Sequence, residues 1–258
     1  DPSSSILVIT TDRDVPDLKF EYERIVWINL SVDLAITNWE DRKVLVYDMI
    51  AALKPKLIHI INSSVAWQVL VERKNCVTIQ TRVFANIFCN QLNEDGSKMG
   101  YANLYLPETY ESLTALFSDN KSFFKDLDFV SNLDANKTLT LYTPFPEIAA
   151  PEKFYTSHVV KKDKLACLWA GRLDWQKNYH LAFEIARQTQ FIDLDMYGSS
   201  VLDELPYIPE IKNLFYKGPF SSLETIPSIQ DYDALIFTTR YEGLPNILIE
   251  AGRLGRPV

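Results

Sequence analysis

The sequence predicts an α/β protein with mainly parallel sheets, and three observations support that class. Short apolar runs rich in β-branched residues recur along the chain. Several of these runs are unbroken rather than alternating, as strands covered on both faces should be. Helical patterns lie between many of them, and such alternation is typical of parallel α/β sheets.

Eight apolar runs are predicted to be strands. They are 6–10 (ILVIT), 24–30 (RIVWINL), 56–61 (KLIHII), 76–80 (CVTIQ), 138–142 (TLTLY), 165–171 (LACLWAG), 191–198 (FIDLDMYG) and 233–239 (DALIFTT). Helices are predicted at 39–54 and 178–188, because apolar residues recur there at the spacing of one helix face. A third helix is predicted at 246–255, with Pro245 suited to its first turn.

A domain boundary is predicted within 143–158 (TPFPEIAAPEKFYTSH). Three prolines disfavour regular structure in this window, and strand–helix alternation restarts after it. We therefore predict two α/β domains, roughly 1–150 and 151–258. Ligands of open α/β sheets bind beyond the carboxyl ends of the strands, so two such domains facing each other would form a ligand-binding cleft.

Composition limits the class of protein. The 258 residues are 47% hydrophobic and 23% charged, which suits a globular protein with a real core and not a disordered chain. A net charge of −8 argues against a nucleic-acid binder, because phosphate contacts need a basic surplus. Cys76, Cys89 and Cys167 lie in or beside apolar runs and are predicted to be buried free thiols in a reducing compartment. The default prediction is a cytoplasmic protein, with peripheral attachment to a membrane left open.

The segment WAGRLDWQKN (169–178) contains a candidate diphosphate site. Gly171 ends a predicted strand and lets a ligand approach the backbone. Arg172 offers planar donors that fit phosphate oxygens, and Lys177 adds a mobile point charge. Asn178 is a favourable N-cap residue for the helix that follows, and a helix N-terminus attracts anions. The simpler alternative is a surface Arg and Lys in an ordinary turn.

The segment RYEGLPNILIEAG (240–252) contains two candidate carboxylates. Glu242 lies in the loop after a predicted strand, and Glu250 lies about one turn inside the next helix. Carboxylates in these positions can accept hydrogen bonds from sugar hydroxyls. Taken alone, the pair is equally well explained as solvent-facing charge.

Together the two segments resemble the retaining family-4 glycosyltransferases. Their Gly-Arg-Leu…Lys-Asn motif occurs at 171–178, and their E-G-x-P-x-x-x-x-E-A-x-x-x-G-x-P-V motif occurs at 242–258. The resemblance is clear over 165–258 and diffuse over 1–150. It implies the GT-B fold, in which two Rossmann-like domains face each other across a cleft. It also implies transfer of a sugar from a nucleotide-diphosphate sugar to a glycan, lipid-linked or other hydroxyl acceptor, typically in polysaccharide biosynthesis.

The resemblance also implies roles for individual residues. Arg172 and Lys177 would hold the donor diphosphate and stabilise the leaving group, Glu242 would lie at the donor sugar, and Glu250 would bind the ribose hydroxyls. The backbone near the donor would come from Gly171, Gly243, Leu244, Pro245 and Asn246, although Pro245 has no N–H to donate. Because cations and a helix N-terminus can stabilise the departing diphosphate, no metal or other cofactor is required.

In the first domain, KPKLIHIINSS (54–64) resembles a family segment that contains two histidines. Ile61 stands where the second histidine would be, and Lys56 replaces an aspartate. His59 is a candidate substrate contact, but it is equally a strand histidine with a satisfied hydrogen bond. Asn62 and Ser63 follow the predicted strand and are better placed to contact a sugar.

Two Asp-x-Asp pairs invite a metal-binding interpretation. Asp193 and Asp195 lie inside a predicted strand, on a face expected to point away from the core of the second domain. Asp231 and Asp233 lead into another strand. We predict no metal role for either pair.

The chain also lacks features that family members usually have. It has 8 glycines and no Gly-Gly pair, and it begins and ends inside the expected domains. We therefore expect a fragment or abbreviated member, incomplete at both termini and part of a longer polypeptide. The alternative function is a non-catalytic GT-B-like module that binds a nucleotide sugar or glycan, or that scaffolds a larger glycan-assembly enzyme. A GT-B-fold epimerase or phosphorylase is less favoured, since no lysine stands in the context that pyridoxal phosphate needs.

Overall fold

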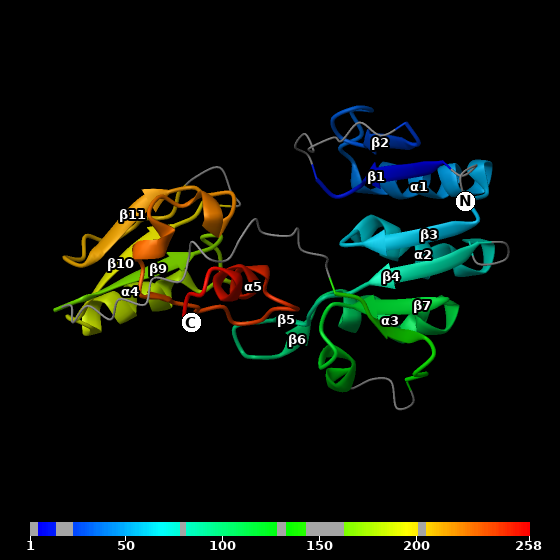
Figure 1. Cartoon of the computed structure of the whole chain (residues 1–258). Helices are drawn as coiled ribbons and strands as arrows, with labels where there is room; N and C mark the ends of the chain where they lie inside the picture. The colour runs from blue at the N-terminus through cyan, green and yellow to red at the C-terminus, as the bar shows by residue number, and fades with distance from the viewer. Residues whose placement is uncertain (1–4, 14–22, 78–80, 128–132, 143–162, 201–204) are drawn as a thin grey trace. The chain divides into compact units, whose positions relative to one another are not determined.

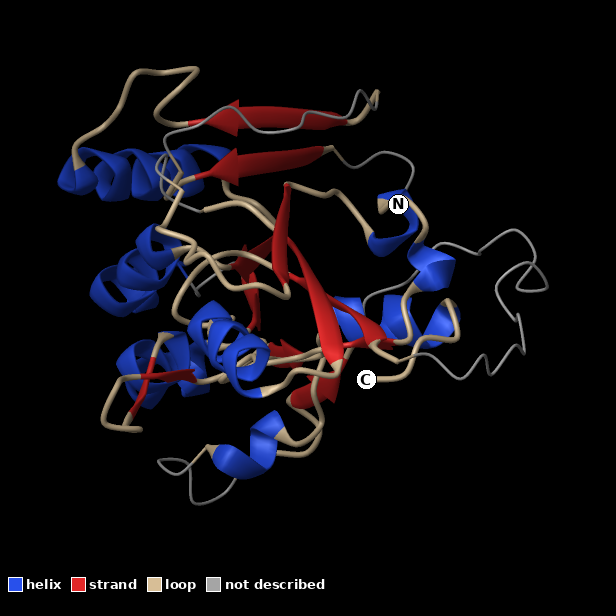
Figure 2. Cartoon of the chain, turned by 90° about the vertical axis from the view of Figure 1, so that its left-hand side faces the viewer, coloured by secondary structure: helices blue, strands red, loops and turns tan. Residues whose placement is uncertain are grey.

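The structure is a computed structural model of the 258-residue chain (Figures 1 and 2). It describes residues 5–13, 23–77, 81–127, 133–142, 163–200 and 205–258. The chain divides into two compact units, Asp1–Tyr142 and Thr143–Val258. The predicted boundary segment 143–158 lies outside the described residues.

The first unit contains two parallel sheets. β1 (Ile6–Thr10) pairs with β2 (Ile25–Asn29), and a four-stranded sheet has the order β3-β4-β7-β8. The strands of the larger sheet are β3 (Leu57–Ile61), β4 (Arg82–Asn86), β7 (Ala115–Ser118) and β8 (Thr138–Thr140). An antiparallel pair, β5 (Gln91–Leu92) and β6 (Lys98–Met99), stands apart. The helices are α1 (Trp39–Leu53), α2 (Ser64–Val77) and α3 (Tyr101–Thr109), with short 3-10 turns η1 (Tyr110–Ser112) and η2 (Phe123–Asp126).

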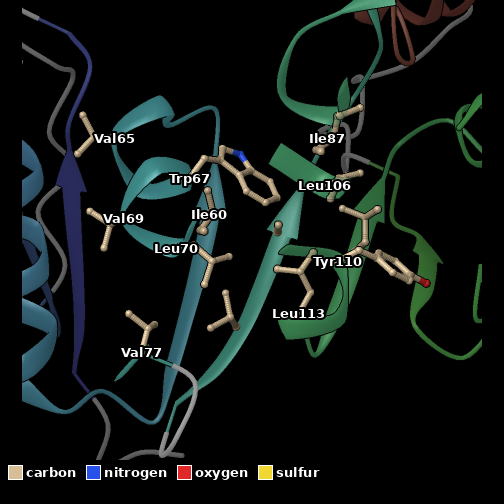
Figure 3. Close-up of a cluster of buried hydrophobic side chains, with 14 of the residues drawn as sticks. Ile60, Val65, Trp67, Val69, Leu70, Val77, Ile87, Leu106, Tyr110 and Leu113 are labelled. Atoms are coloured by element: carbon tan, nitrogen blue, oxygen red, sulfur yellow. The ribbon is translucent and has the colours of Figure 1, made fainter. Parts of the chain in front are cut away.

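One apolar core joins these helices to the sheet. Alternate strand residues, such as Ile60 of β3 and Val83 of β4, face the helices and are buried. Figure 3 shows Trp67 and Leu70 of α2 between that helix and the strands. Burying a side chain of this size contributes roughly 1.5–3 kcal/mol, so this core fixes where the strands end.

The start of α2 brings two strand ends of the first unit together. The Asp12 carboxylate, just after β1, accepts hydrogen bonds from the Ser64 amide at 2.6 Å and the Val65 amide at 3.3 Å. These amides have no partner within the helix, so Asp12 caps α2 from another segment of the chain. Ser63, between β3 and α2, is fixed in the same region because its Oγ lies 2.6 Å from Thr11 Oγ1.

The second unit is built on a parallel sheet of order β11-β10-β9-β12. Its strands are β9 (Leu165–Ala170), β10 (Ile192–Tyr197), β11 (Leu214–Gly218) and β12 (Ala234–Leu235). Its helices are α4 (Tyr179–Gln188) and α5 (Asn246–Arg253), with 3-10 turns η4 (Leu223–Thr225) and η5 (Ile229–Asp231). Cys167 and Trp169 of β9 pack with α4, whereas Leu168 and Ala170 pack in a second cluster with α5. The predicted α/β class with mainly parallel sheets is therefore confirmed.

Several local predictions were wrong. Cys76 and Val77 end α2 rather than starting a strand, and the strand of this region is β4; residues 78–80 lie outside the described chain. Val77 is buried in the same core as the other apolar residues of α2, so packing of the helix outweighs the β-branched composition. Pro245 is the N-cap of α5 rather than part of its first turn. β12 is only two residues long.

The cysteines are only partly as predicted. All three are free thiols, but Cys167 alone is buried, whereas Cys89 is half-buried and Cys76 is exposed. Cys76 is exposed because the last turn of α2 buries Val77 instead. Burial raises the pKa of the Cys167 thiol.

Every helix in the described part of the chain is too short or too polar to cross a membrane.

The Asn38 cap of α1 gives a test of this fold. Asn38 Oδ1 accepts hydrogen bonds from the Glu40 amide at 2.9 Å and the Asp41 amide at 3.3 Å. Asn38→Ala should lower the free energy of unfolding by about 1 kcal/mol, because two helix amides lose their acceptor. Urea unfolding measures this, with Asn136→Ala as the control at another exposed asparagine. Equal stability of the two variants would contradict the cap.

Candidate active site

The cationic loop, residues 171–178, begins where β9 ends. The ends of β9 and β10 approach each other closely, because a Cβ on Gly198 would lie 2.0 Å from the Gly171 carbonyl oxygen. Glycine is therefore required at 198. Beyond this contact the loop turns back on itself, since the Asp174 carboxylate accepts a hydrogen bond from the Lys177 amide at 2.9 Å. This turn places the Lys177 side chain beside Gly171, where β9 ends, since a Cβ on Gly171 would lie 3.6 Å from Lys177 Cγ.

Arg172 and Lys177 differ in environment. The Arg172 side chain is 52% exposed; its Nε lies 3.0 Å from Asp174 Oδ2, and its Nη2 donates to Gln176 Oε1 at 2.7 Å. The Lys177 side chain is 19% exposed and forms an ion pair with Glu242. Both cations are thus paired with a carboxylate, but Arg172 is accessible at the surface whereas Lys177 is largely covered.

The glutamate loop, residues 239–245, lies beside the cationic loop because β12 pairs with β9. In this pairing Ala234 is opposite Cys167 and Leu235 is opposite Leu168. Buried Thr238 fixes the two loops further, since its Oγ1 donates to the Lys177 carbonyl at 2.7 Å and accepts from Trp169 Nε1 at 2.8 Å. Sequence reasoning did not find Thr238.

The structure brings Lys177 and Glu242 together as an ion pair, whereas Arg172 lies in the same loop as Lys177 and contacts Asp174 and Gln176. Glu250, in α5, accepts a hydrogen bond from the Leu223 amide through Oε2 at 2.9 Å. Leu223 is the first residue of η4, so Glu250 faces a different segment from Glu242. The four predicted charged residues therefore form one ion pair, Lys177–Glu242, and Arg172 and Glu250 are each held by other partners.

The remaining predicted donor contacts lie at the start of the cationic loop, in the glutamate loop and at the start of α5. Gly171, Gly243, Leu244 and Pro245 are half-buried, and Asn246 is the exposed first residue of α5. Asn178 does not cap α4 with its side chain as predicted. Its backbone is left-handed with φ 52°, and its Oδ1 accepts from Arg240 Nη2 at 2.8 Å instead.

A pocket beside Glu250 was not predicted. It has a volume of about 300 Å³ and is lined by residues that follow β10 and β11 or flank η4: Tyr197, Pro219, Phe220, Ser221, Thr225, Ile226 and Pro227. Leu223, whose amide contacts Glu250, lies between two of these lining segments. The aromatic residues at the ends of β10 and β11 are the signal in the sequence that could have located the pocket.

The Asp-x-Asp pairs form hydrogen bonds within the protein. Asp193 forms an ion pair with Lys164 at 2.6 Å, and Asp195 lies 3.4 Å from Lys217 and accepts from the Tyr232 hydroxyl at 2.7 Å. Burial, and then the hydrogen bond to Asp195, raise the pKa of Tyr232. Asp233 accepts from the Ala166 amide at 2.8 Å. Across the described ranges, no three His, Cys, Asp or Glu side chains gather as a metal site would require.

In the first unit, the three predicted residues do not share one environment. His59 lies in the middle of β3, with Nε2 2.6 Å from Asn86 Oδ1 and its ring 5.8 Å from that of Phe117. Ser63 is 9% exposed and accepts from the Ala66 amide at 2.9 Å. Asn62 is exposed just beyond the end of the strand, with φ 47°, and His59 is also exposed.

Comparison with known proteins relates this chain to solved structures of one fold. The chain matches no protein-family model and no curated protein. Among solved structures it is similar to TarM of S. aureus, in a complex with UDP and α-GlcNAc-glycerol, with a TM-score of 0.58 and 15% identity over 84% of this chain and 44% of that one. It is also similar to HepE of Anabaena in complex with UDP and glucose, with a TM-score of 0.58 and 12% identity over 91% and 66% of the two chains.

A third similar structure is trehalose-6-phosphate synthase, with a TM-score of 0.55 and 12% identity over 96% and 74% of the two chains. The chain has the fold of GT-B glycosyltransferases. It spans less than half the length of TarM. Membership of family 4, transfer with retention and the roles of the individual residues remain predictions.

The half-buried ion pair of the GT-B chain gives a second test. Lys177→Met should lower the free energy of unfolding by about 1–3 kcal/mol, because the Glu242 carboxylate loses its partner in a partly desolvated position. Urea unfolding should show that adding Glu242→Gln recovers part of this loss.

Lys164→Met is the matched control, because the ion pair of Lys164 with Asp193 is about twice as exposed. Its effect should be below about 1 kcal/mol. If Lys177→Met and Lys164→Met were equally mild, the Lys177–Glu242 pair would not hold the two loops together.

Proposed function

We propose that the protein is a retaining glycosyltransferase that moves a sugar from a nucleotide-diphosphate sugar to a hydroxyl of a glycan, lipid-linked or other acceptor. The observation that carries the proposal is the Lys177–Glu242 ion pair between two loops that follow neighbouring parallel strands, with Arg172 in the same loop as Lys177. Such a strand edge is where open α/β sheets bind ligands. By the resemblance alone, the pathway is polysaccharide biosynthesis, in the cytoplasm or at the inner face of the membrane.

Charge development in the reaction accounts for the two cations. Cleavage of the anomeric C–O bond leaves positive charge on the sugar and negative charge on the departing diphosphate. Arg172 and Lys177 are preorganised to stabilise the diphosphate. An ammonium has three donors, so Lys177 can contact a phosphate oxygen while it still holds Glu242. Within the described chain Arg172 Nη1 makes no hydrogen bond, so it too can donate to a phosphate oxygen.

Glu242 then lies beside the sugar that is attached to the diphosphate. Its carboxylate can accept hydrogen bonds from sugar hydroxyls and stabilise the positive charge that develops at the anomeric carbon. Because these cations and the N-terminus of α5 supply the charge that the diphosphate needs, we propose that no metal ion is required.

Glu250 and the adjoining pocket fit the nucleoside. The Leu223 amide holds Glu250 Oε2, so the carboxylate is oriented to accept hydrogen bonds from ribose hydroxyls. A ribose at Glu250 places the base near the pocket lined by Tyr197 and Phe220, whose rings offer apolar surface to a planar base. Since the TarM and HepE structures contain UDP, UDP-sugars are the first donors to test.

One observation favours the non-catalytic alternative. His59 is bound to Asn86 in the middle of β3, and Ile61 occupies the position of the second family histidine. A module without that histidine could bind a nucleotide sugar without transferring the sugar. Donor binding without transfer or hydrolysis would support this alternative.

The catalytic proposal is tested by Glu242→Gln in the complete polypeptide. The variant keeps the shape of the side chain but loses its charge, so sugar transfer should slow about 100-fold or more. Transfer from UDP-, GDP-, ADP- and dTDP-sugars is measured in the presence of EDTA. Glu184→Gln, at an exposed site on α4, is the control and should leave the rate unchanged. An unchanged rate for Glu242→Gln would remove this residue from the active site.

Glu250→Gln tests the nucleoside site separately. Loss of a charged acceptor for the ribose should weaken binding of the nucleoside diphosphate about tenfold, with transfer at saturating donor changed less than about threefold. Titration calorimetry measures binding, with Glu224→Gln on η4 as the control. The assignment fails if Glu250→Gln binds the nucleotide as tightly as the unmodified protein.

A further inference from the structure

We infer that Gln176 is a positioning residue, which sets the distance between the cationic group that binds the diphosphate and the carboxylate that faces the sugar. The catalytic consequence of this inference rests on the proposed function, whereas the contacts that Gln176 makes between the two loops do not depend on it. Gln176 is half-buried and lies directly before Lys177 in the cationic loop.

The side-chain amide of Gln176 joins the two loops. Its Oε1 accepts from Arg172 Nη2 at 2.7 Å, and its Nε2 donates to the Tyr241 carbonyl at 3.0 Å. Tyr241 immediately precedes Glu242, so one planar amide connects the Arg172 guanidinium to the backbone that carries the carboxylate. Neither end can be reversed, because a guanidinium only donates hydrogen bonds and a carbonyl only accepts them.

The backbone of Gln176 makes a third connection. Its carbonyl accepts from the Arg240 amide at 2.9 Å, in the same loop as Tyr241. Two successive residues of the glutamate loop are therefore bound to one residue of the cationic loop. This arrangement fixes the register between the loops where no regular strand pairing continues, since β12 ends at Leu235.

The Arg240 side chain secures the outer side of the same junction. Its guanidinium carbon lies 3.6 Å from the centroid of the Trp175 ring, and its Nη2 donates to Asn178 Oδ1 at 2.8 Å. Trp175 is 41% exposed, so the stacked pair lies at the surface of the junction. Residues 175, 176 and 178 of the cationic loop thus all contact the glutamate loop.

The consequence is a difference between two substitutions at one position. In Gln176→Glu a carboxylate still accepts from Arg172, but it cannot donate to the Tyr241 carbonyl and it repels that oxygen. In Gln176→Met both bonds are lost. The Glu variant should therefore loosen the glutamate loop and keep the bond to Arg172, whereas the Met variant should loosen the loop and leave Arg172 held by Asp174 alone. Gln190→Glu makes the same chemical change at an exposed site of the same unit and is the control.

The first measurement is amide hydrogen exchange by NMR on the ligand-free full chain. Exchange at the Arg240 amide, which donates to the Gln176 carbonyl at 2.9 Å, should become about fivefold faster or more in Gln176→Glu and Gln176→Met, because the side-chain bond that holds the same loop is lost, and should not change in Gln190→Glu. Unchanged exchange in both Gln176 variants would overturn the inference. This measurement needs no donor, so it decides the role of Gln176 even if the protein transfers no sugar.

The second measurement is transfer kinetics. Gln176→Glu should lower kcat about tenfold with the donor KM within about threefold, because the groups remain present but are misplaced. A residue that acts partly through Arg172 should have a smaller effect once Arg172 is gone. In an Arg172→Ala background, Gln176→Met should therefore lower kcat by a smaller factor than it does in the unmodified chain. Fully multiplicative effects, or a change in KM alone, would contradict a positioning role.

Discussion

The parallel pairing of β9 with β12 is the constraint on which the candidate site depends. Lys177 and Glu242 are 65 residues apart in the sequence, and they meet because their strands end at the same edge of one sheet. An antiparallel pairing would send the two loops to opposite edges. The core on both faces of β9 enforces the pairing, since alternate residues of this strand are buried against α4 on one side and α5 on the other.

The two candidate glutamates of the second unit, Glu242 and Glu250, have different partners. Glu242 is neutralised by a lysine within the loops, whereas Glu250 is oriented by a backbone amide of η4. A carboxylate beside a cation suits a place where charge develops during a reaction. A carboxylate held by an amide suits the recognition of neutral hydroxyls. The proposed division between sugar and ribose rests on the resemblance to family-4 enzymes, and these partners support it.

Much of the fold could be predicted from the sequence, because parallel strands leave unbroken apolar runs. The runs at β1, β2, β3, β9 and β10 were found for this reason, although β9 and β10 are largely buried and β1 has no buried residue. The run at 76–80 was wrongly predicted to be a strand. Val77 belongs to α2 and packs in the core from that helix, although β-branched residues are typical of strands. Motif spacing found Arg172, Lys177, Glu242 and Glu250, since these are properties of single short segments. It could not find Thr238 or Gln176, whose roles depend on backbone atoms of a distant loop.

The measurement that tests the account most directly is a crystal structure of the full polypeptide with a bound nucleoside diphosphate. The account predicts the diphosphate within hydrogen-bonding distance of Arg172 and Lys177, the ribose hydroxyls on Glu250, and the base at the pocket lined by Tyr197 and Phe220. A diphosphate bound away from both cations, or a ribose that does not reach Glu250, would contradict it.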